Sequence, residues 1–376
     1  MRPYGDGQNA RSDHACQLID RKITVVQTPD TPNDLPAARP FLGVYDYSYA
    51  PYSLGDTVTW QMNVLVSAVE AGANAIDHVL VVDPRKPACW MQPHIDSDNY
   101  RIALQNIFPA FLCSPLLRSF RLFRDRAAFD LYLVSNLLDG HKTHPTVANH
   151  LQRRMGAGGF VSTRHGGFPL NHSMLNAFHR KRGYLPRLCA PRGYRRAAAD
   201  FLMRRAADKI AVAVHVRQSK LSSAPASLHR DSVAGAWLGF FRSAAVFWPD
   251  VVFLVLGGYD EWERPLLFLD NVVIPRTHGL GLAHELALLH QADLFMGASS
   301  GFSAMATFST VPYVIFNMEH DFAQYNDVPV GEPRYPFALA NQSICWEAET
   351  TPLLLDFFDR AHRGLRERRS SAPRAG

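Results

Sequence analysis

The chain has 376 residues, of which 47% are hydrophobic and 19% are charged. This ordinary globular composition excludes disorder over most of the length, and the length suffices for two domains with separate cores. The formal net charge of +5 favours anionic partners, although a modest excess of this kind is also typical of a soluble surface.

The five cysteines are far apart and include no Cys-x-x-Cys pair. This arrangement excludes a disulfide framework and a zinc knuckle, and it favours a reducing compartment. No apolar run approaches the roughly 20 residues that a membrane span requires. We therefore expect a cytoplasmic protein, either free or peripheral on the inner face of a membrane.

The sequence of the first half predicts a flexible arm followed by alternating strands and helices. Residues 1–38 are polar and proline-rich, and we expect them to form the arm. Strands are predicted at 41–45, 78–83 and 120–123, and helices at 57–71, 100–111 and 126–138. This order predicts a Rossmann-like domain over 39–190, which ends in an interdomain region rich in Arg, His and Gly.

The second half repeats the alternation with stronger signals. Strands are predicted at 210–217, 251–256 and 271–274, helices at 191–207, 231–247 and 282–291, and a strand–turn–helix–strand unit at 292–316. Asp231 is the expected N-cap of its helix. The pattern predicts a mostly parallel sheet in a domain over 191–350, followed by a helix and basic tail over 351–376. The arginines of this tail are compatible with binding to anionic lipid. The alternative is that they belong to a solvated helix end with no partner.

Polar residues follow the buried strand that begins the second half. In strand geometry His215 and Arg217 point to the same side, so that both can contact one anion. Lys220 adds a second cation, and Arg is suited to grip a phosphate through two hydrogen bonds. The alternative is that Arg217 only solvates the end of the strand.

Two further turns carry small residues at strand ends. Ser299, Ser300, Gly301 and Ser303 open a short helix, where hydroxyls and unpaired backbone N–H groups suit a pyrophosphate. The same residues also suit a tight connection with a cap. At Gly257 and Gly258 the backbone can approach a flat ring, on which Tyr259 is placed to stack.

The turn Gly55-Asp56 precedes the first predicted helix. Asp56 is either an N-cap or, if the turn faces a cleft, a carboxylate that takes a proton from an acceptor hydroxyl. The loop around it is rich in tyrosine, at positions 45, 47, 49 and 52. These rings provide a stacking wall for a sugar, or they pack against their own domain.

Several familiar chemistries are excluded by their missing motifs. The sequence has no Walker phosphate loop, no Gly-x-Gly-x-x-Gly after a strand, no His-Glu-x-x-His and no Gly-x-Ser-x-Gly. The histidine pairs lack a third ligand at convincing spacing, and the Asp96/Asp98 pair follows no clear strand. We expect no metal site.

Three motifs resemble those of GT-B glycosyltransferases. The stretch 282–316 is similar to the nucleotide-sugar half of the heptosyltransferase-like group, which has a glutamate in the helix (here Glu285), then Ser300-Gly301 and Pro312. Gly55-Asp56 resembles the opening of heptosyltransferases, which implies that Asp56 is the base. His215-x-Arg217 is similar to the His-x-Arg motif of fucosyltransferases, whose arginine holds the β-phosphate of the donor.

We therefore expect an α/β protein that is GT-B-like, with two Rossmann-like domains facing across a cleft. The expected activity is sugar transfer from a nucleotide sugar to a hydroxyl of a glycan or glycolipid, without metal, cofactor or nucleic acid. Asp56 and Arg217 are the predicted catalytic residues. The predicted donor-binding residues are His215, Lys220, Gly257, Gly258, Glu285, Ser299, Ser300, Gly301 and Ser303. A nucleotide-sugar epimerase of the same fold and a non-catalytic sugar- or nucleotide-binding module are the alternatives.

Overall fold

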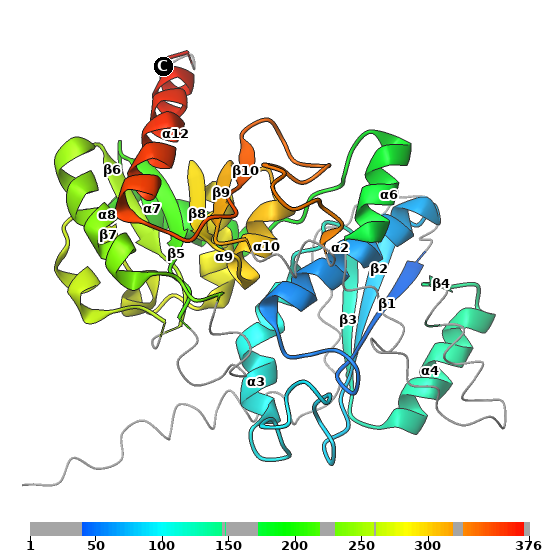
Figure 1. Ribbon diagram of the computed structural model, residues 1–376. Helices are drawn as coiled ribbons and strands as arrows, with labels where there is room; N and C mark the ends of the chain where they lie inside the picture. Colours follow the sequence, from blue (N-terminus) through cyan, green and yellow to red (C-terminus); the bar gives the residue numbers. More distant parts are fainter. Residues whose placement is uncertain are drawn as a thin grey trace, which may run out of the picture.

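The computed structural model describes residues 40–144, 147, 172–218, 230–258, 261–318 and 326–371. Within these residues the chain forms two parallel sheets of four and six strands, with helices packed around them (Figure 1). The expected α/β class is thereby confirmed. The predicted arm over 1–38, Lys220 and Tyr259 lie outside the described residues.

The first sheet has the strand order β3-β2-β1-β4. Its elements are β1 (Pro40–Asp46), α2 (Leu54–Glu70), β2 (Ala75–Val81), α3 (Tyr100–Ile107), the 3₁₀ helix η1 (Phe108–Leu112), β3 (Leu117–Phe123), α4 (Arg126–Leu138) and β4 (Lys142–Thr143). All seven residues of β2 are buried, as expected for an inner strand of a parallel sheet. The predicted helix over 100–111 is interrupted, because its last turn is the 3₁₀ segment that contains Pro109.

Helix α2 begins one turn earlier than the sequence pattern predicts. Ser53 has extended backbone dihedrals and is the N-cap, and its hydroxyl accepts a hydrogen bond from the N–H of Asp56 at 3.4 Å. Gly55 and Asp56 therefore lie within the first turn of the helix and not before it. Asp56 is not the N-cap, but as an acid in the first turn it has a favourable interaction with the helix dipole.

The second sheet has the strand order β10-β9-β8-β5-β6-β7. Its strands are β5 (Ile210–His215), β6 (Val251–Val255), β7 (Val272–Val273), β8 (Leu294–Ala298), β9 (Tyr313–Phe316) and β10 (Gln342–Ile344). Strand β5 is central and all six of its residues are buried. It pairs with both β6 and β8, and His215 lies opposite Gly297.

The helical segments beside the second sheet are α7 (Arg192–Arg205), α8 (Ala234–Phe247), η3 (Arg264–Phe268), η4 (Pro275–His278), α9 (Leu282–Gln291), α10 (Gly301–Thr307) and α12 (Thr351–Ser371). Helix α12 packs against α8 and buries Leu354, Phe358 and Leu365. The predicted N-cap role of Asp231 is wrong: α8 begins at Ala234 after Val233, and the carboxylate of Asp231 is engaged by Arg217.

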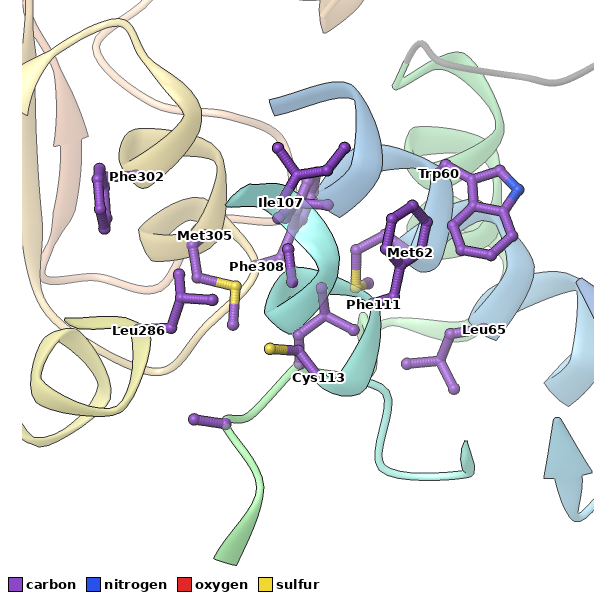
Figure 2. Close-up of a cluster of buried hydrophobic side chains, with 14 of the residues drawn as sticks. Trp60, Met62, Leu65, Ile107, Phe111, Cys113, Leu286, Phe302, Met305 and Phe308 are labelled. Atoms are coloured by element: carbon purple, nitrogen blue, oxygen red, sulfur yellow. The ribbon is translucent and has the colours of Figure 1, made fainter. Parts of the chain in front are cut away.

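The two halves of the molecule share one buried apolar cluster. Figure 2 shows that residues of α2 and η1 from the first half lie beside residues of α9 and α10 from the second. Trp60, Met62 and Phe111 contribute from the first half, and Leu286 and Met305 from the second. This contact holds the first turn of α2 against the first turn of α10.

The segment that joins the halves is also tied to both of them. It includes α6 (Ser173–Arg182), which packs against α2. From α6, the buried amide of Asn176 donates to the backbone carbonyl of Asp327 at 2.9 Å. Further along, the guanidinium of Arg187 donates to the carbonyls of Thr307 and Phe337. These bonds satisfy buried polar groups and fix the position of the two halves.

Candidate functional site

His215 lies at the carboxyl end of β5 and is 4% exposed. Its Nδ1 is 2.9 Å from the hydroxyl of Ser300, and its Nε2 is 3.6 Å from a carboxylate oxygen of Glu261. The ring also packs against Phe302, with 4.8 Å between ring centroids. Both nitrogens of His215 thus face protein groups, and the imidazole is held between two loops.

Gly297 allows these loops to meet. A Cβ at this position would lie 2.7 Å from the backbone oxygen of His215, which is closer than side-chain atoms approach. With glycine there, β8 runs directly beside the end of β5. The turn that follows β8 therefore brings Ser300 to the imidazole.

The turn between β8 and α10 is built from serine hydroxyls. Ser300 is the N-cap of α10, and its Oγ accepts from the N–H of Ser303 at 3.3 Å. The hydroxyl of Ser303 donates to the carbonyl of Ala298 and is buried. Ser299 and Ser300 are half-buried, so they are the members of the turn that a ligand can reach.

The turn after β6 wraps around the carboxylate of Glu261. The N–H of Gly258 donates to Glu261 Oε2 at 2.6 Å. Gly257 has φ +128°, and a Cβ there would lie 2.5 Å from the same oxygen. The backbone conformation therefore favours glycine at 257, and a larger residue would also displace the carboxylate of Glu261.

The carboxylate of Glu285 binds the backbone of this turn. Its side chain is fully buried, its Oε1 accepts from the N–H of Gly257 at 3.0 Å, and its Oε2 is 2.7 Å from Nη2 of Arg276. Burial raises the pKa of Glu285, and Arg276 and the Gly257 N–H partly offset this effect. The predicted donor-binding residue Glu285 thus contacts the glycine turn and Arg276.

Glu261 remains ionised over the whole physiological range. Burial raises its pKa, but His215, the N–H of Gly258 and Arg276 outweigh this effect and lower the pKa to about 2. The sequence reasoning missed both Glu261 and Arg276. The available signal was the position of Glu261, an acid three residues after Gly258 in the loop at the carboxyl end of a strand next to β5.

Arg217 lies two residues after β5, and its side chain is 11% exposed. Its Nη1 donates to the carboxylate of Asp231 at 2.6 Å, and its backbone N–H donates to the hydroxyl of Ser232 at 3.0 Å. The side chains of His215 and Arg217 thus have different partners in this structure. Asp231 orients the guanidinium at the same edge of the sheet.

The first turn of α2, which holds Asp56, contacts the first turn of α10. A Cβ at Gly301 would lie 2.6 Å from Cβ of Leu54, and a Cβ at Gly55 would lie 3.7 Å from Cα of Gly301. Leu54 and Gly55, the two residues before the predicted base, therefore lie against the predicted donor turn. Asp56 also acts on its own half, since burial together with Asp56 raises the pKa of Tyr45 well above its usual value.

The tyrosine-rich loop does not provide the stacking wall that was one of the two expectations. Tyr45 and Tyr47 are fully buried, and Tyr52 is 7% exposed. Tyr47 and Tyr52 stack on each other, with 4.0 Å between ring centroids. The hydroxyl of Tyr52 donates to the carbonyl of Pro87. These three rings pack against their own domain, which was the other expectation.

Among the described residues, no group of three or more His, Cys, Asp or Glu side chains is arranged to hold a metal ion. In the same part of the chain, no helix has both the length and the apolar character needed to cross a membrane.

No protein-family model and no curated protein sequence matches the chain. In solved structures, it is similar to a family 9 glycosyl transferase from Veillonella parvula (12% identity, 88% of this chain, 90% of that chain, TM-score 0.44). It is also similar to the ADP-heptose lipopolysaccharide heptosyltransferase II of E. coli (10% identity, 87% and 99%, TM-score 0.49). A third similarity is to a putative UDP-N-acetylglucosamine 2-epimerase from Listeria monocytogenes (9% identity, 74% and 79%, TM-score 0.31).

Proposed function

We propose that the protein is a glycosyltransferase that moves a sugar from a nucleotide-sugar donor to a hydroxyl of a glycan or glycolipid acceptor. The observation that carries the proposal is the contact between the first turns of α2 and α10. It brings the first turn of α2, to which Asp56 belongs, against the first turn of α10, and this supports the proposal that the carboxylate of Asp56 acts as a base beside the serine turn 299–303. An acid beside a cluster of hydroxyl, N–H and guanidinium donors is the arrangement that displacement of a diphosphate requires.

In the proposed reaction, Asp56 takes the proton of the acceptor hydroxyl. The acceptor oxygen then forms a bond to the anomeric carbon of the donor, and the bond from that carbon to the diphosphate oxygen breaks. The diphosphate leaves with the bonding electrons and gains negative charge. In-line attack of this kind inverts the configuration at the anomeric carbon.

The groups proposed to receive this charge are hydroxyls, backbone N–H groups and cations, with no divalent ion. Ser299 and Ser300 are half-buried at the α10 turn. Arg217 is held by Asp231, and a bound diphosphate would compete with Asp231 for its guanidinium. Lys220, two residues past the described end of this segment, is a further proposed contact.

Peripheral binding to an anionic membrane is a second part of the proposal. Helix α12 exposes arginines along its last three turns, and two of them, Arg360 and Arg363, form i,i+4 pairs with Asp356 and Asp359. Such pairs between exposed residues are weak, so the arginines can exchange their partners for lipid phosphates. Flotation with vesicles that contain or lack anionic lipid tests this part.

The transfer reaction is tested with a panel of nucleotide sugars, by following nucleotide release with and without acceptor glycans. We expect Asp56→Asn to lower acceptor-dependent release by about 10²-fold or more, because it removes the general base. The control Asp139→Asn changes an exposed carboxylate at the end of α4 and should keep the wild-type rate. Undiminished release in Asp56→Asn would remove Asp56 as the base.

The donor side is tested by calorimetry with nucleoside diphosphates. Arg217→Ala should weaken binding by about 1.5–3 kcal/mol, the usual contribution of a hydrogen bond to a charged group. Unchanged affinity would contradict the proposed contact. Tight binding without sugar release or conversion would favour the non-catalytic binding module, and an isomerised nucleotide sugar would favour the epimerase.

A further inference from the structure

Three loops that are distant in sequence bring Glu261, His215 and Ser300 into a continuous polar chain. Glu261 follows β6, His215 ends β5, and Ser300 follows β8. The carboxylate lies 3.6 Å from Nε2 of the imidazole, and Nδ1 lies 2.9 Å from the serine hydroxyl. This polar chain runs from the half-buried carboxylate of Glu261, through the buried imidazole, to the half-buried hydroxyl of Ser300.

The hydrogen positions on the serines follow from their partners. Ser303 donates its hydroxyl proton to the carbonyl of Ala298, so at 3.2 Å from Ser300 its oxygen can only accept. The N–H of Ser303 donates to Ser300 Oγ. The direction of the Ser300 proton therefore depends on whether Nδ1 of His215 donates to this oxygen or accepts from it.

The imidazole is placed to act through Ser300 and not on a ligand directly. It is 4% exposed, one ring face packs on Phe302, and Nε2 is buried without a hydrogen-bond partner among the described residues. The charged groups around it are Glu261 on the β6 loop and Glu285 on α9, the latter paired with Arg276 of η4. Glu261 is the carboxylate that lies 3.6 Å from Nε2 of the ring.

We propose that Glu261 is a positioning residue that holds His215 as a doubly protonated imidazolium, so that the Ser300 hydroxyl is presented as a hydrogen-bond donor to an oxyanion. This inference deepens the proposed function and rests on it, since the oxyanion would be the diphosphate of the donor. The 3.6 Å separation between Nε2 and the carboxylate supports the inference, because an opposite charge this close favours the charged form of a titratable group.

The proton arrangement explains how one carboxylate can change ligand binding without touching the ligand. With an imidazolium, the Nδ1–H and the N–H of Ser303 fill both acceptor positions of Ser300 Oγ. The Ser300 proton is then left for Ser303 Oγ or for a bound oxyanion, which is the stronger acceptor. When the ring is neutral and lacks the Nδ1 proton, Nδ1 accepts a hydrogen bond from the Ser300 hydroxyl. The serine oxygen then presents only lone pairs to the anion, which is unfavourable for binding.

The first test reads the ring itself in ¹⁵N-histidine-labelled protein. At pH 7 we expect His215 to show the nitrogen shifts of an imidazolium in the wild type and the shifts of a neutral ring in Glu261→Gln. The matched control is Glu263→Gln, which makes the same change at an exposed residue two positions away. Glutamine at 261 can still accept from the N–H of Gly258, so the turn is retained. Identical ring signals in wild type and Glu261→Gln would overturn the proposal.

The second test uses inorganic pyrophosphate as the ligand, in calorimetry between pH 6 and pH 8. Glu261→Gln and Ser300→Ala should each weaken binding about tenfold at pH 7, and the double variant should lose little more, because both changes remove the same donor. Glu261→Gln shows how the ionisation of pyrophosphate itself changes binding over this range, and relative to this variant the wild-type affinity should fall as the pH rises. Equal affinity of wild type and Glu261→Gln would overturn the proposal.

These results separate the inference from the transferase activity. If both tests give the expected results and no nucleotide sugar is consumed, the positioning role stands and the proposed function fails. If sugar transfer is observed and Glu261→Gln matches the wild type in ring signals and in affinity, the transferase stands and the positioning role fails.

Discussion

The carboxyl edges of the two sheets have opposite characters. In the first sheet, β1 ends in Asp46, which is bound by Arg126 and by the N–H of Ser48. The loop that follows is filled by buried tyrosines. In the second sheet, the ends of β6 and β8 carry Gly257 and Gly297, and serine hydroxyls follow β8. The neighbouring strand β5 ends in His215, whose Nε2 has no hydrogen-bond partner among the described residues.

This difference indicates a division of labour between the halves. Large side chains and a closed ion pair leave no backbone for a ligand to approach at the end of β1. Glycine and serine at the ends of β6 and β8 do leave such an approach. The first half contributes its candidate residue Asp56 from the end of a helix, which the apolar contact in Figure 2 holds in place. We infer that the edge of the first sheet is scaffold and that the edge of the second is the binding surface.

The largest expected effect comes from opening the ion pair of the scaffold edge. Arg126→Met removes the guanidinium that pairs with Asp46. The carboxylate of Asp46, whose side chain is 5% exposed, is then buried without its charged partner. Breaking a buried pair on one side typically costs about 3 kcal/mol or more, so the free energy of unfolding should fall by about that amount. Urea denaturation measures the loss, and binding of pyrophosphate to the folded variant should be unchanged.

The matched control is Arg363→Met, which breaks the exposed pair with Asp359 on α12. Exposed pairs contribute about 0–1 kcal/mol, so this variant should unfold close to the wild type. If Arg126→Met also abolished pyrophosphate binding while remaining folded, the edge of the first sheet would be part of the binding surface and the comparison would fail.

A smaller effect is expected where the two halves touch. Gly301→Ala places a Cβ 2.6 Å from Cβ of Leu54, so α2 and α10 must separate. Overpacking of this kind costs about 2 kcal/mol, and the shift also moves Asp56 away from the serine turn. The free energy of unfolding, measured by urea denaturation, and the rate of acceptor-dependent nucleotide release should therefore both be lower than in the wild type.

Gly55→Ala is the control across the same contact. Its Cβ would meet Cα of Gly301 at 3.7 Å, an ordinary contact, and alanine favours the helix. This variant should match or exceed the stability of the wild type. In the Gly301→Ala background, Leu54→Gly should restore part of the lost rate, because it removes the Cβ and the side-chain carbons that the new methyl group meets. If Gly301→Ala were as active as Gly55→Ala, the spacing of the two helices would not matter to the reaction.

The sequence predicted the local elements well where hydrophobic periodicity was strong. Helix 126–138 and helix 282–291 have the predicted bounds, because apolar spacing and flanking turn residues agree there. The buried strand that begins at Ile210 and the serine turn before α10 were also predicted. Such signals are carried by neighbouring residues, so one sequence is enough to read them.

Contacts between distant segments were not predictable in the same way. Glu261 meets His215 across 46 positions of the sequence, and Gly301 meets Leu54 across the two halves. Both contacts depend on strand order and domain packing, which periodicity does not encode. The start of α2 was missed because the cap at Ser53 lies in a loop of mixed polar and aromatic residues. The burial of the tyrosines likewise depends on what packs against them.

The smallest expected effect concerns how stability depends on pH. We attribute this dependence to buried histidines of the scaffold, and distinguish it from the pH dependence of ligand binding at the site. Burial lowers the pKa of His172 to about 3 and that of His78 to about 4, against about 6.5 in an unfolded chain. Each folded-state pKa lies below the unfolded value, so the unfolded state binds the extra proton first and stability is lost as pH falls below 6.5. Between pH 7 and pH 5.5 each group should remove about 1.3 kcal/mol.

His172→Phe tests this assignment, because His172 is packed among the rings of Phe308, Tyr335 and Phe337, and its Nδ1 has no partner among the described residues. A phenylalanine suits this apolar site, and in urea titrations at the two pH values the variant should lose about 1.3 kcal/mol less stability than the wild type. An equal loss would mean that other groups cause the acid sensitivity. With the scaffold made less sensitive in this way, the part of the pH dependence of pyrophosphate binding that Glu261→Gln removes is assigned to the chain Glu261, His215 and Ser300.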